Sequence, residues 1–147
     1  MATIKKVVIP VDFSSNMDKV IDYGVSIASV FGAKIDFLHV VDDFKGYDML
    51  LVHPSFKSIT NDLQQQAKKQ MDDVVDKQST QKNEVSGHVA VGYATDEIIS
   101  YAKKTEADLI IIGTHGNKGI ERILMGSTAS QVVKNAPCPV LVFNPFT

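Results

Sequence analysis

The sequence predicts an α/β domain, in which an open parallel sheet carries helices on both faces. Five short apolar segments alternate with four segments of helical periodicity, the order that right-handed crossovers between parallel strands produce. The strand segments are nearly continuous β-branched runs, such as residues 7–9 and 110–112, which is typical of strands buried on both faces. Because composition does not shift along the 147 residues, we expect a single domain over residues 1–147.

The first strand is expected in the β-branched run of residues 7–11, which Asp12 ends. A helix should follow, because apolar or small residues recur at helical spacing at Met17, Val20, Gly24, Ile27, Ala28 and Phe31. Ser15 and Asp18 fit a capping box at the start of this helix, and Gly32 fits its C-terminal stop.

The second strand is expected near residues 34–41, and residues 42–53, which have no clear period, should form a long connection. A second helix should run from about Pro54 to about Gln78, because proline is tolerated in a first helical turn. Its buried stripe is expected to consist of Ile59, Leu63, Ala67, Met71 and Val74.

The second half of the chain continues the alternation with a strand, a helix, a strand, a helix and a strand, over residues 83–92, 94–105, 107–113, 119–135 and 139–143. Thr95 is expected to be the N-cap of the first of these helices. Ile98, Ile99 and Ala102 should face inward from it.

The composition argues against several classes of function. A net charge of −2 without clustered basic residues gives no reason to expect nucleic acid. Zinc has little support, because no paired ligand spacing relates the four histidines, His39, His53, His88 and His115. No apolar run approaches the roughly 18 residues of a membrane span. The first residues lack a signal peptide and the chain has one cysteine, Cys138, so we expect a cytoplasmic protein.

Four small residues after the fourth strand form the pattern G-x2-G-x9-G-S, at Gly113, Gly116, Gly126 and Ser127. The chain contains neither GxxxxGK[ST] nor GxGxxG, so this is not a P-loop or a dinucleotide fingerprint. Glycines nevertheless let backbone N–H groups approach a bulky anion, and the amides and hydroxyls of residues 126–128 could hold phosphate oxygens.

Ordinary structural roles compete with these functional ones. A single glycine after a strand is common in turns, and Lys118 and Arg122 either supply positive charge to a phosphate or are surface charges of a helix start. Asp12 either binds the ligand or a bridging metal, or is the N-cap of the next helix. His39 is expected to be a hydrogen-bonded interior or rim residue, and Cys138 a buried, unreactive one.

The chain resembles the universal stress protein family in its nucleotide-binding branch. The resemblance covers nearly the whole chain and includes "VVIPVDFS", "LHVVD", "ADLIIIGTHG", the glycine spacing and "APCPVLVF". It implies a five-stranded parallel sheet of order 3-2-1-4-5, a Rossmann-like fold of the adenine nucleotide alpha hydrolase type, and ATP bound at the carboxyl edge with or without Mg²⁺.

The resemblance also implies the ligand-binding residues. Those expected at the adenosine end are Pro10, Val11, Asp12 and Val40. Those expected to hold the ribose and phosphates are Gly113, Gly116, Gly126, Ser127 and Thr128. Ile112, just before Gly113, is also expected to bind the nucleotide. This chain has Ala129 where many members carry a hydroxyl residue, which would remove one phosphate contact.

The function that follows is an ATP-binding stress-response or signalling module. One alternative is a slow ATPase or phosphotransferase, although no base or acid pair is recognisable for phosphoryl transfer. Another is a dimeric interaction module with an empty site. A homodimer is expected in either case, because the order 3-2-1-4-5 places an apolar strand at the sheet edge, where a partner would cover Val140, Leu141, Val142 and Phe143.

Overall fold

A computed structural model describes residues 3–42, 54–79, 82–114 and 126–146 of the chain. These residues form one five-stranded parallel sheet of order β3-β2-β1-β4-β5, which confirms the order expected from the resemblance. In chain order the elements are β1 (Lys6–Pro10), α1 (Met17–Phe31), β2 (Lys34–Val41), α2 (Pro54–Gln78), β3 (Val85–Val91), α3 (Ala94–Lys104), β4 (Leu109–Gly113), α4 (Ser127–Asn135) and β5 (Val140–Phe143).

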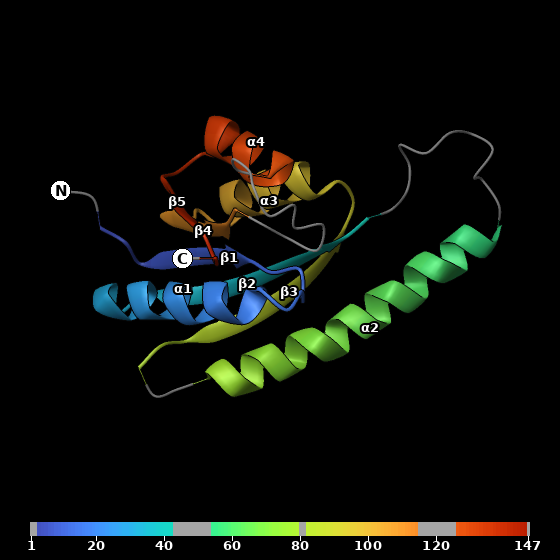
Figure 1. The fold of residues 1–147 in the computed structure, drawn as a ribbon, viewed down its shortest axis with the longest axis horizontal. Helices are drawn as coiled ribbons and strands as arrows, with labels where there is room; N and C mark the ends of the chain where they lie inside the picture. Colours follow the sequence, from blue (N-terminus) through green and yellow to red (C-terminus); the bar gives the residue numbers. More distant parts are fainter. Residues whose placement is uncertain (1–2, 43–53, 80–81, 115–125, 147) are drawn as a thin grey trace.

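The helices cover the two faces of the sheet in pairs, as Figure 1 shows, with α1 and α2 on one side and α3 and α4 on the other. Side chains alternate along each strand, so consecutive residues enter opposite cores. Val7, Ile9 and Phe37 belong to the core under α1 and α2. Val8 and Leu38 belong to the core under α3 and α4. The strands are therefore buried on both faces, as their apolar sequences predict.

The order of the strands reverses between β1 and β4. β1 pairs with β2 on one side and with β4 on the other, and all these pairs are parallel. The carboxyl ends of β1, β2 and β4 consequently meet at one edge of the sheet. In open α/β sheets, ligands bind outside the carboxyl ends of the strands at such a reversal point.

The boundaries of α1 correct one prediction and confirm another. Asn16 is the N-cap and makes no side-chain capping bond, so the predicted capping box of Ser15 and Asp18 is wrong. The turn before the helix has hydrogen bonds of its own. The Ser14 amide donates to Oδ1 of Asp12, and the Met17 amide donates to the Ser14 carbonyl. At the other end, Gly32 has the expected left-handed conformation, with a φ of 63°.

Thr95 does not cap α3. The N-cap is Tyr93, in extended backbone, and Thr95 lies inside the first turn with its side chain buried. The predicted inward face of this helix holds for Ile98 and Ala102, which are both buried. The fourth helix was expected near 119–135, but Gly126 is its N-cap and the helix begins at Ser127.

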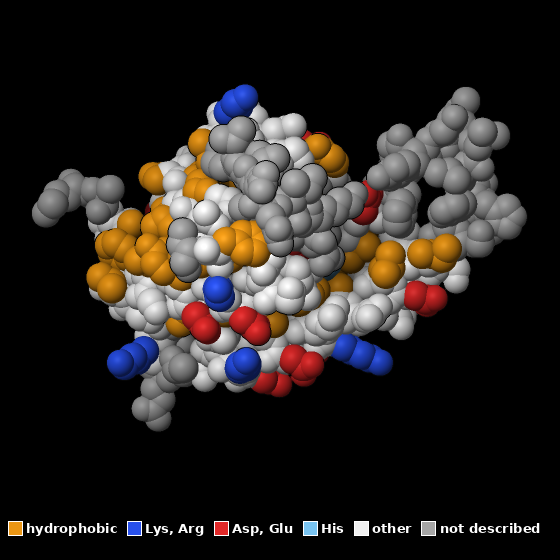
Figure 2. Space-filling view, viewed as in Figure 1, with side chains coloured by type: hydrophobic (Ala, Val, Ile, Leu, Met, Phe, Trp, Pro, Cys, Tyr) orange, Lys and Arg blue, Asp and Glu red, His pale blue; other side chains and the backbone are white. Residues whose placement is uncertain are grey.

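The bounds of α2 agree with the sequence prediction, but only part of its expected stripe is buried. Ala67 and Met71 are buried against the sheet, whereas Ile59 is 46% exposed and Leu63 39% exposed. The first turns of α2 extend beyond the ends of β2 and β3 in Figure 1, and Figure 2 shows apolar side chains along this part. Phe31 at the end of α1, one of the residues at helical spacing, is likewise 49% exposed.

None of the helices in the described ranges has both the length and the apolar character that a membrane crossing requires.

Candidate functional site

The ends of three neighbouring strands bring most of the expected ligand-binding residues together. Val40 and Ile112 belong to the side-chain layer under α3 and α4. Pro10 ends β1 and pairs with Leu38, another residue of that layer, so it faces the same side. These apolar groups form one wall at the carboxyl edge, on the face of the sheet that also carries the starts of α3 and α4.

Val11 is placed differently from its neighbours. Its side chain is 4% exposed and belongs to the opposite core, under α1 and α2. Its amide donates to the Leu38 carbonyl at 2.8 Å, and its carbonyl oxygen lies 2.7 Å from Nδ1 of His39. Both backbone polar groups of Val11 are thus bound within the protein, so this residue anchors the strand end.

The end of β4 is joined directly to the start of α4. The Thr114 amide donates to the Phe143 carbonyl at 2.9 Å, and the Gly126 amide donates to the Thr114 carbonyl at 2.9 Å. A Cβ atom on Gly126 would lie 3.0 Å from that carbonyl oxygen, so the close approach favours glycine. Gly113, Thr114 and Gly126 therefore lie side by side, although a stretch of sequence separates them.

Part of the predicted glycine loop lies outside the described residues. This applies to Gly116, His115 and the two candidate cations, Lys118 and Arg122. The described part of the candidate site consists of residues on either side of that stretch.

The start of α4 has the properties of an anion-binding site. Gly126 offers no side chain to cap the helix, and its first turn contains no acidic residue. The first amides of the helix thus carry the partial positive charge of the helix dipole without a side-chain cap. Ser127 is exposed and Thr128 half-buried, so their hydroxyls lie next to these amides, whereas Ala129 is buried in the core.

The turn after β1 holds the one acidic residue that was predicted for the site. Oδ1 of Asp12 accepts a hydrogen bond of 2.9 Å from the Ser14 amide. Asp12 therefore stabilises its own turn, and the alternative that it caps α1 is wrong, because the cap is Asn16. Between them, Phe13 has a φ of 60°, a left-handed conformation that costs a non-glycine residue about 1–2 kcal/mol.

His39 supports this turn from β2. Its Nδ1 atom must carry the proton, because the Val11 carbonyl, 2.7 Å away, can only accept. Burial lowers the pKa of His39, against weaker opposing effects of this hydrogen bond and of Asp12. Its ring lies 4.4 Å from the ring of Phe13, tilted by 38°. The prediction of a hydrogen-bonded rim residue is confirmed.

Two buried hydroxyls near this edge have no hydrogen-bond partner among the residues that the structure describes. They are Oγ of Ser14, in the turn after β1, and Oγ1 of Thr95, in the first turn of α3. Buried polar atoms without partners are rare in folded proteins, and a polar ligand or water is a common explanation. Both hydroxyls follow the carboxyl end of a strand, as the expected ligand-binding residues do.

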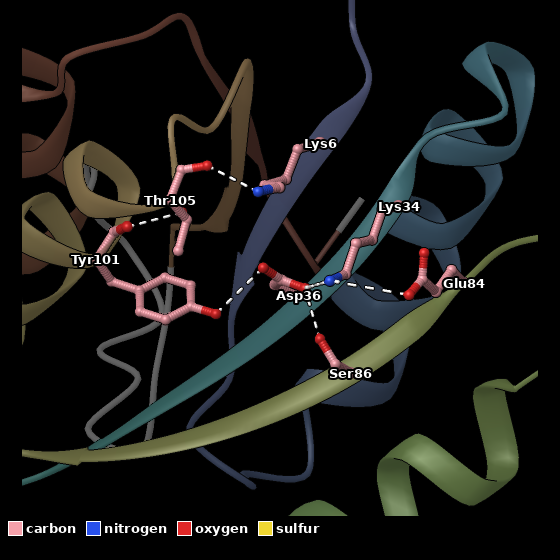
Figure 3. A network of polar contacts seen from close by, with 7 residues as sticks. All are labelled: Lys6, Lys34, Asp36, Glu84, Ser86, Tyr101 and Thr105. Carbon is pink, nitrogen blue, oxygen red and sulfur yellow. Dashed lines mark hydrogen bonds and ion pairs between the residues drawn. The ribbon is translucent and has the colours of Figure 1, made fainter.

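A buried polar cluster further from the edge, drawn in Figure 3, was not among the predicted features. Asp36 of β2 is 2% exposed and accepts hydrogen bonds from Oγ of Ser86 at 2.6 Å and from the Tyr101 hydroxyl at 3.1 Å. Nζ of Lys34 lies 3.8 Å from Asp36. Burial, together with the charge of Asp36, raises the pKa of Tyr101. An acid within the apolar strand "KIDFLHVV" was the available signal.

This cluster fixes α3 against the sheet. Tyr101 joins the helix to β2, Ser86 joins β2 to β3, and the Thr105 hydroxyl donates to the Tyr101 carbonyl at 2.7 Å. Nowhere in the described ranges, this cluster included, do His, Cys, Asp and Glu side chains gather in groups of three that could hold a metal ion. Cys138 is half-buried, and burial raises the pKa of its thiol, which disfavours a reactive thiolate.

The chain has clear relatives among known proteins. Residues 3–144 match the model of the Universal stress protein family. The chain is 36% identical over 140 residues to Universal stress protein MJ0531 of Methanocaldococcus jannaschii. This alignment covers 94% of this chain and 81% of that protein. Universal stress protein UspA from Lactobacillus plantarum has a similar structure, with a TM-score of 0.86 and 30% identity over 97% of this chain and 99% of that one. The hypothetical protein MJ0577 is similar with a TM-score of 0.84 and 27% identity over 97% and 96% of the two chains. This chain therefore belongs to the universal stress protein family.

Proposed function

We propose that this protein binds an adenine nucleotide, ATP in the first place, and acts in the cytoplasm as a stress-response or signalling module. The main observation in support of the proposal is the hydrogen-bonded connection between the end of β4 and the start of α4. There, the Gly126 amide is bound to Thr114, and the helix start that follows has neither a capping side chain nor an acidic residue. Such a helix start favours a phosphate group over a neutral ligand.

The two parts of the nucleotide would occupy different sides of this edge. Pro10, Val40 and Ile112 offer an apolar wall for the base, with the Asp12 carboxylate beside it for a ribose or base donor. Gly113, Gly126, Ser127 and Thr128 would hold the ribose and phosphates, with Gly116 contributing from outside the described residues. If Mg²⁺ accompanies the phosphates, Asp12 is the carboxylate of this set that would bind it.

Two more distant structures show which ligands other proteins of this fold carry. A universal stress protein in complex with cAMP and one from Archaeoglobus fulgidus in complex with dAMP are each 21% identical to this chain, with TM-scores of 0.61 and 0.63. At this level of identity, the similarity of these two structures to this chain shows the fold alone. The proposal for this chain therefore depends on its own glycines and helix start.

Binding without rapid hydrolysis fits the site best. Phosphoryl transfer requires a positioned nucleophile, a metal held by acids and cations near the transferred group. Asp12 is the acid that was predicted for this edge, and one of its oxygens already accepts a backbone hydrogen bond. A slow ATPase or phosphotransferase is the second candidate, and Lys118 and Arg122 are the cations it would use.

A homodimer through β5 accompanies this proposal. β5 is the last strand in the sheet order, and its four residues, Val140–Phe143, are all half-buried. A second copy would cover this apolar edge. Sedimentation velocity at micromolar concentration should show a dimer, and a monomer at every concentration would contradict it.

The nucleotide itself can be identified directly. The purified protein is denatured, and the supernatant is analysed for adenine nucleotides by chromatography. Co-purified ATP supports the proposal, whereas a supernatant without adenine nucleotide, together with no thermal shift on adding ATP, refutes it. A bound ligand raises the stability by RT ln(1 + [L]/Kd), about 2.7 kcal/mol at one hundred times Kd.

Two variants connect the thermal shift to the glycines. Gly113→Val and Gly126→Val each place a branched side chain where backbone must approach the ligand, so both should abolish the shift. A matched control is Gly32→Ala, because Gly32 ends α1 and a Cβ atom added there would meet nothing within 4 Å. If the shift survives both valine substitutions, the nucleotide is bound elsewhere.

A further inference from the structure

The end of β1 is held by two consecutive residues of β2. The Val11 amide donates to the Leu38 carbonyl at 2.8 Å, which continues the ladder of the sheet. The Val11 carbonyl accepts from a side chain, Nδ1 of His39, at 2.7 Å. The backbone is thus fixed on both sides of the residue that precedes Asp12.

The turn that follows is strained and depends on its surroundings. Phe13 has a φ of 60°, which an L-residue adopts only where neighbouring contacts impose it. Its ring packs on the His39 ring with centroids 4.4 Å apart, and it also contacts the core under α1 and α2. The Ser14 amide, next along the chain, binds Oδ1 of Asp12. Together these contacts determine where the Asp12 carboxylate lies.

His39 acts from the opposite side of the sheet to the candidate site. Its neighbours Leu38 and Val40 face α3 and α4, as does Ile112. Because side chains alternate along a strand, His39 faces the other layer, where Phe13 also packs. It therefore reaches the site only through the backbone of Val11 and the ring of Phe13.

We propose that His39 is a positioning residue of the nucleotide site, which holds Val11 and Phe13 so that the Asp12 carboxylate is fixed at the carboxyl edge. The role as part of a nucleotide site rests on the function proposed above. The contacts of His39 with Val11 and Phe13, called the clamp below, exist in the protein without ligand. Their effect on the turn can therefore be measured without nucleotide.

Three variants separate the hydrogen bond from the ring contact. His39→Asn retains an N–H donor close to the position of Nδ1 but has no ring. His39→Phe retains a ring but has no donor. Phe13→Gly removes the ring of the turn and tolerates the positive φ. His88→Phe is the matched control, because His88 is an exposed histidine on β3 whose ring lies beside Tyr101.

The first measurement is amide hydrogen exchange of Ser14 in the nucleotide-free protein, since this amide reports the Asp12 turn. His39→Phe should speed its exchange about tenfold, the size expected for one lost hydrogen bond, whereas His39→Asn should stay within about threefold of wild type. Phe13→Gly should also speed it, and His88→Phe should not. If the Ser14 amide exchanged at the wild-type rate in both His39→Phe and Phe13→Gly, the proposal that His39 and Phe13 fix this turn would be overturned.

The second measurement is the Kd for ATP by calorimetry. His39→Phe should weaken binding about tenfold, with His39→Asn restoring most of the affinity at a similar melting temperature. A general loss of stability would instead affect both His39 variants according to their melting temperatures. Unchanged affinity in His39→Phe would refute the positioning role. A wild-type protein that binds no adenine nucleotide refutes the proposed function, and Ser14 exchange then still decides for or against the clamp.

Discussion

The Gly126 amide donates a hydrogen bond of 2.9 Å to the Thr114 carbonyl oxygen, which ties the start of α4 to the end of β4. Gly126 has a φ of −54° and a ψ of 156°, which any L-residue adopts without strain. The requirement for glycine at this position therefore comes from the close contact with Thr114. Gly32, in contrast, has a φ of 63° and open space around it.

These two glycines should respond in opposite ways to alanine. Gly126→Ala places a methyl group 3.0 Å from the Thr114 oxygen and shifts the helix start, so it should weaken ATP binding at least about tenfold with little loss of stability. Gly32→Ala should lower the free energy of unfolding by about 1 kcal/mol and leave ATP binding unchanged. Calorimetry and urea denaturation of both variants provide the comparison. Equal effects of the two variants on ATP affinity would contradict this assignment.

The Asp36 cluster should contribute to stability through its donors. Tyr101→Phe removes one of the two hydroxyl groups that donate to this buried carboxylate, at a cost of about 1–3 kcal/mol in the free energy of unfolding. Tyr93→Phe is the control, because Tyr93 is 56% exposed, and it should change stability by less than about 0.5 kcal/mol. Urea denaturation measures both, and equal small effects would show that Asp36 does not need the phenol.

Tyr101 should also affect stability at alkaline pH. Burial beside Asp36 raises the pKa of its phenol above the ordinary value of 10.0. The unfolded chain then loses this proton before the folded protein does. The contribution to stability is complete below about pH 10 and is lost as the pH rises through the folded pKa. Phenolate absorbance should show one late-titrating tyrosine that is missing in Tyr101→Phe. A titration in which Tyr101→Phe retains the same late step as wild type would contradict the expectation.

The sheet was predictable from the sequence because burial on both faces leaves a direct record. Runs such as residues 7–9 and 110–112 contain no polar residue. The positions of these strands and of their buried side chains therefore follow from the sequence pattern. The bounds of α2 were predictable because Pro54 restricts where the helix begins. The exposure of Ile59 was not predictable, because helical periodicity indicates which face of a helix is apolar but not how much of that face the sheet covers.

The candidate site was predictable as a set of residues but not as a geometry. Nothing in the sequence indicates that Phe13 has a positive φ, since phenylalanine rarely does. Nor does it indicate that Nδ1 of His39 donates a hydrogen bond to the Val11 carbonyl. Thr95 shows the same limit: a good N-cap residue follows the strand, but the extended backbone of Tyr93 places the N-cap two positions earlier. Caps and turns depend on how the chain leaves the sheet, which tertiary contacts decide.

The lowered pKa of His39 predicts a pH dependence of stability on the acidic side. Burial favours the neutral ring in the folded protein, and the hydrogen bond to the Val11 carbonyl and the charge of Asp12 oppose this effect more weakly. The unfolded chain therefore binds the proton first as the pH falls past the ordinary value of 6.5. Stability is lost progressively from about pH 6.5 downward, until the pH reaches the folded pKa. His39→Asn cannot take up this proton, so the difference in unfolding free energy between wild type and this variant should shrink from pH 7.5 to pH 5. Urea denaturation at several pH values measures this difference. A constant difference across the range would mean that His39 titrates alike in the folded and unfolded states.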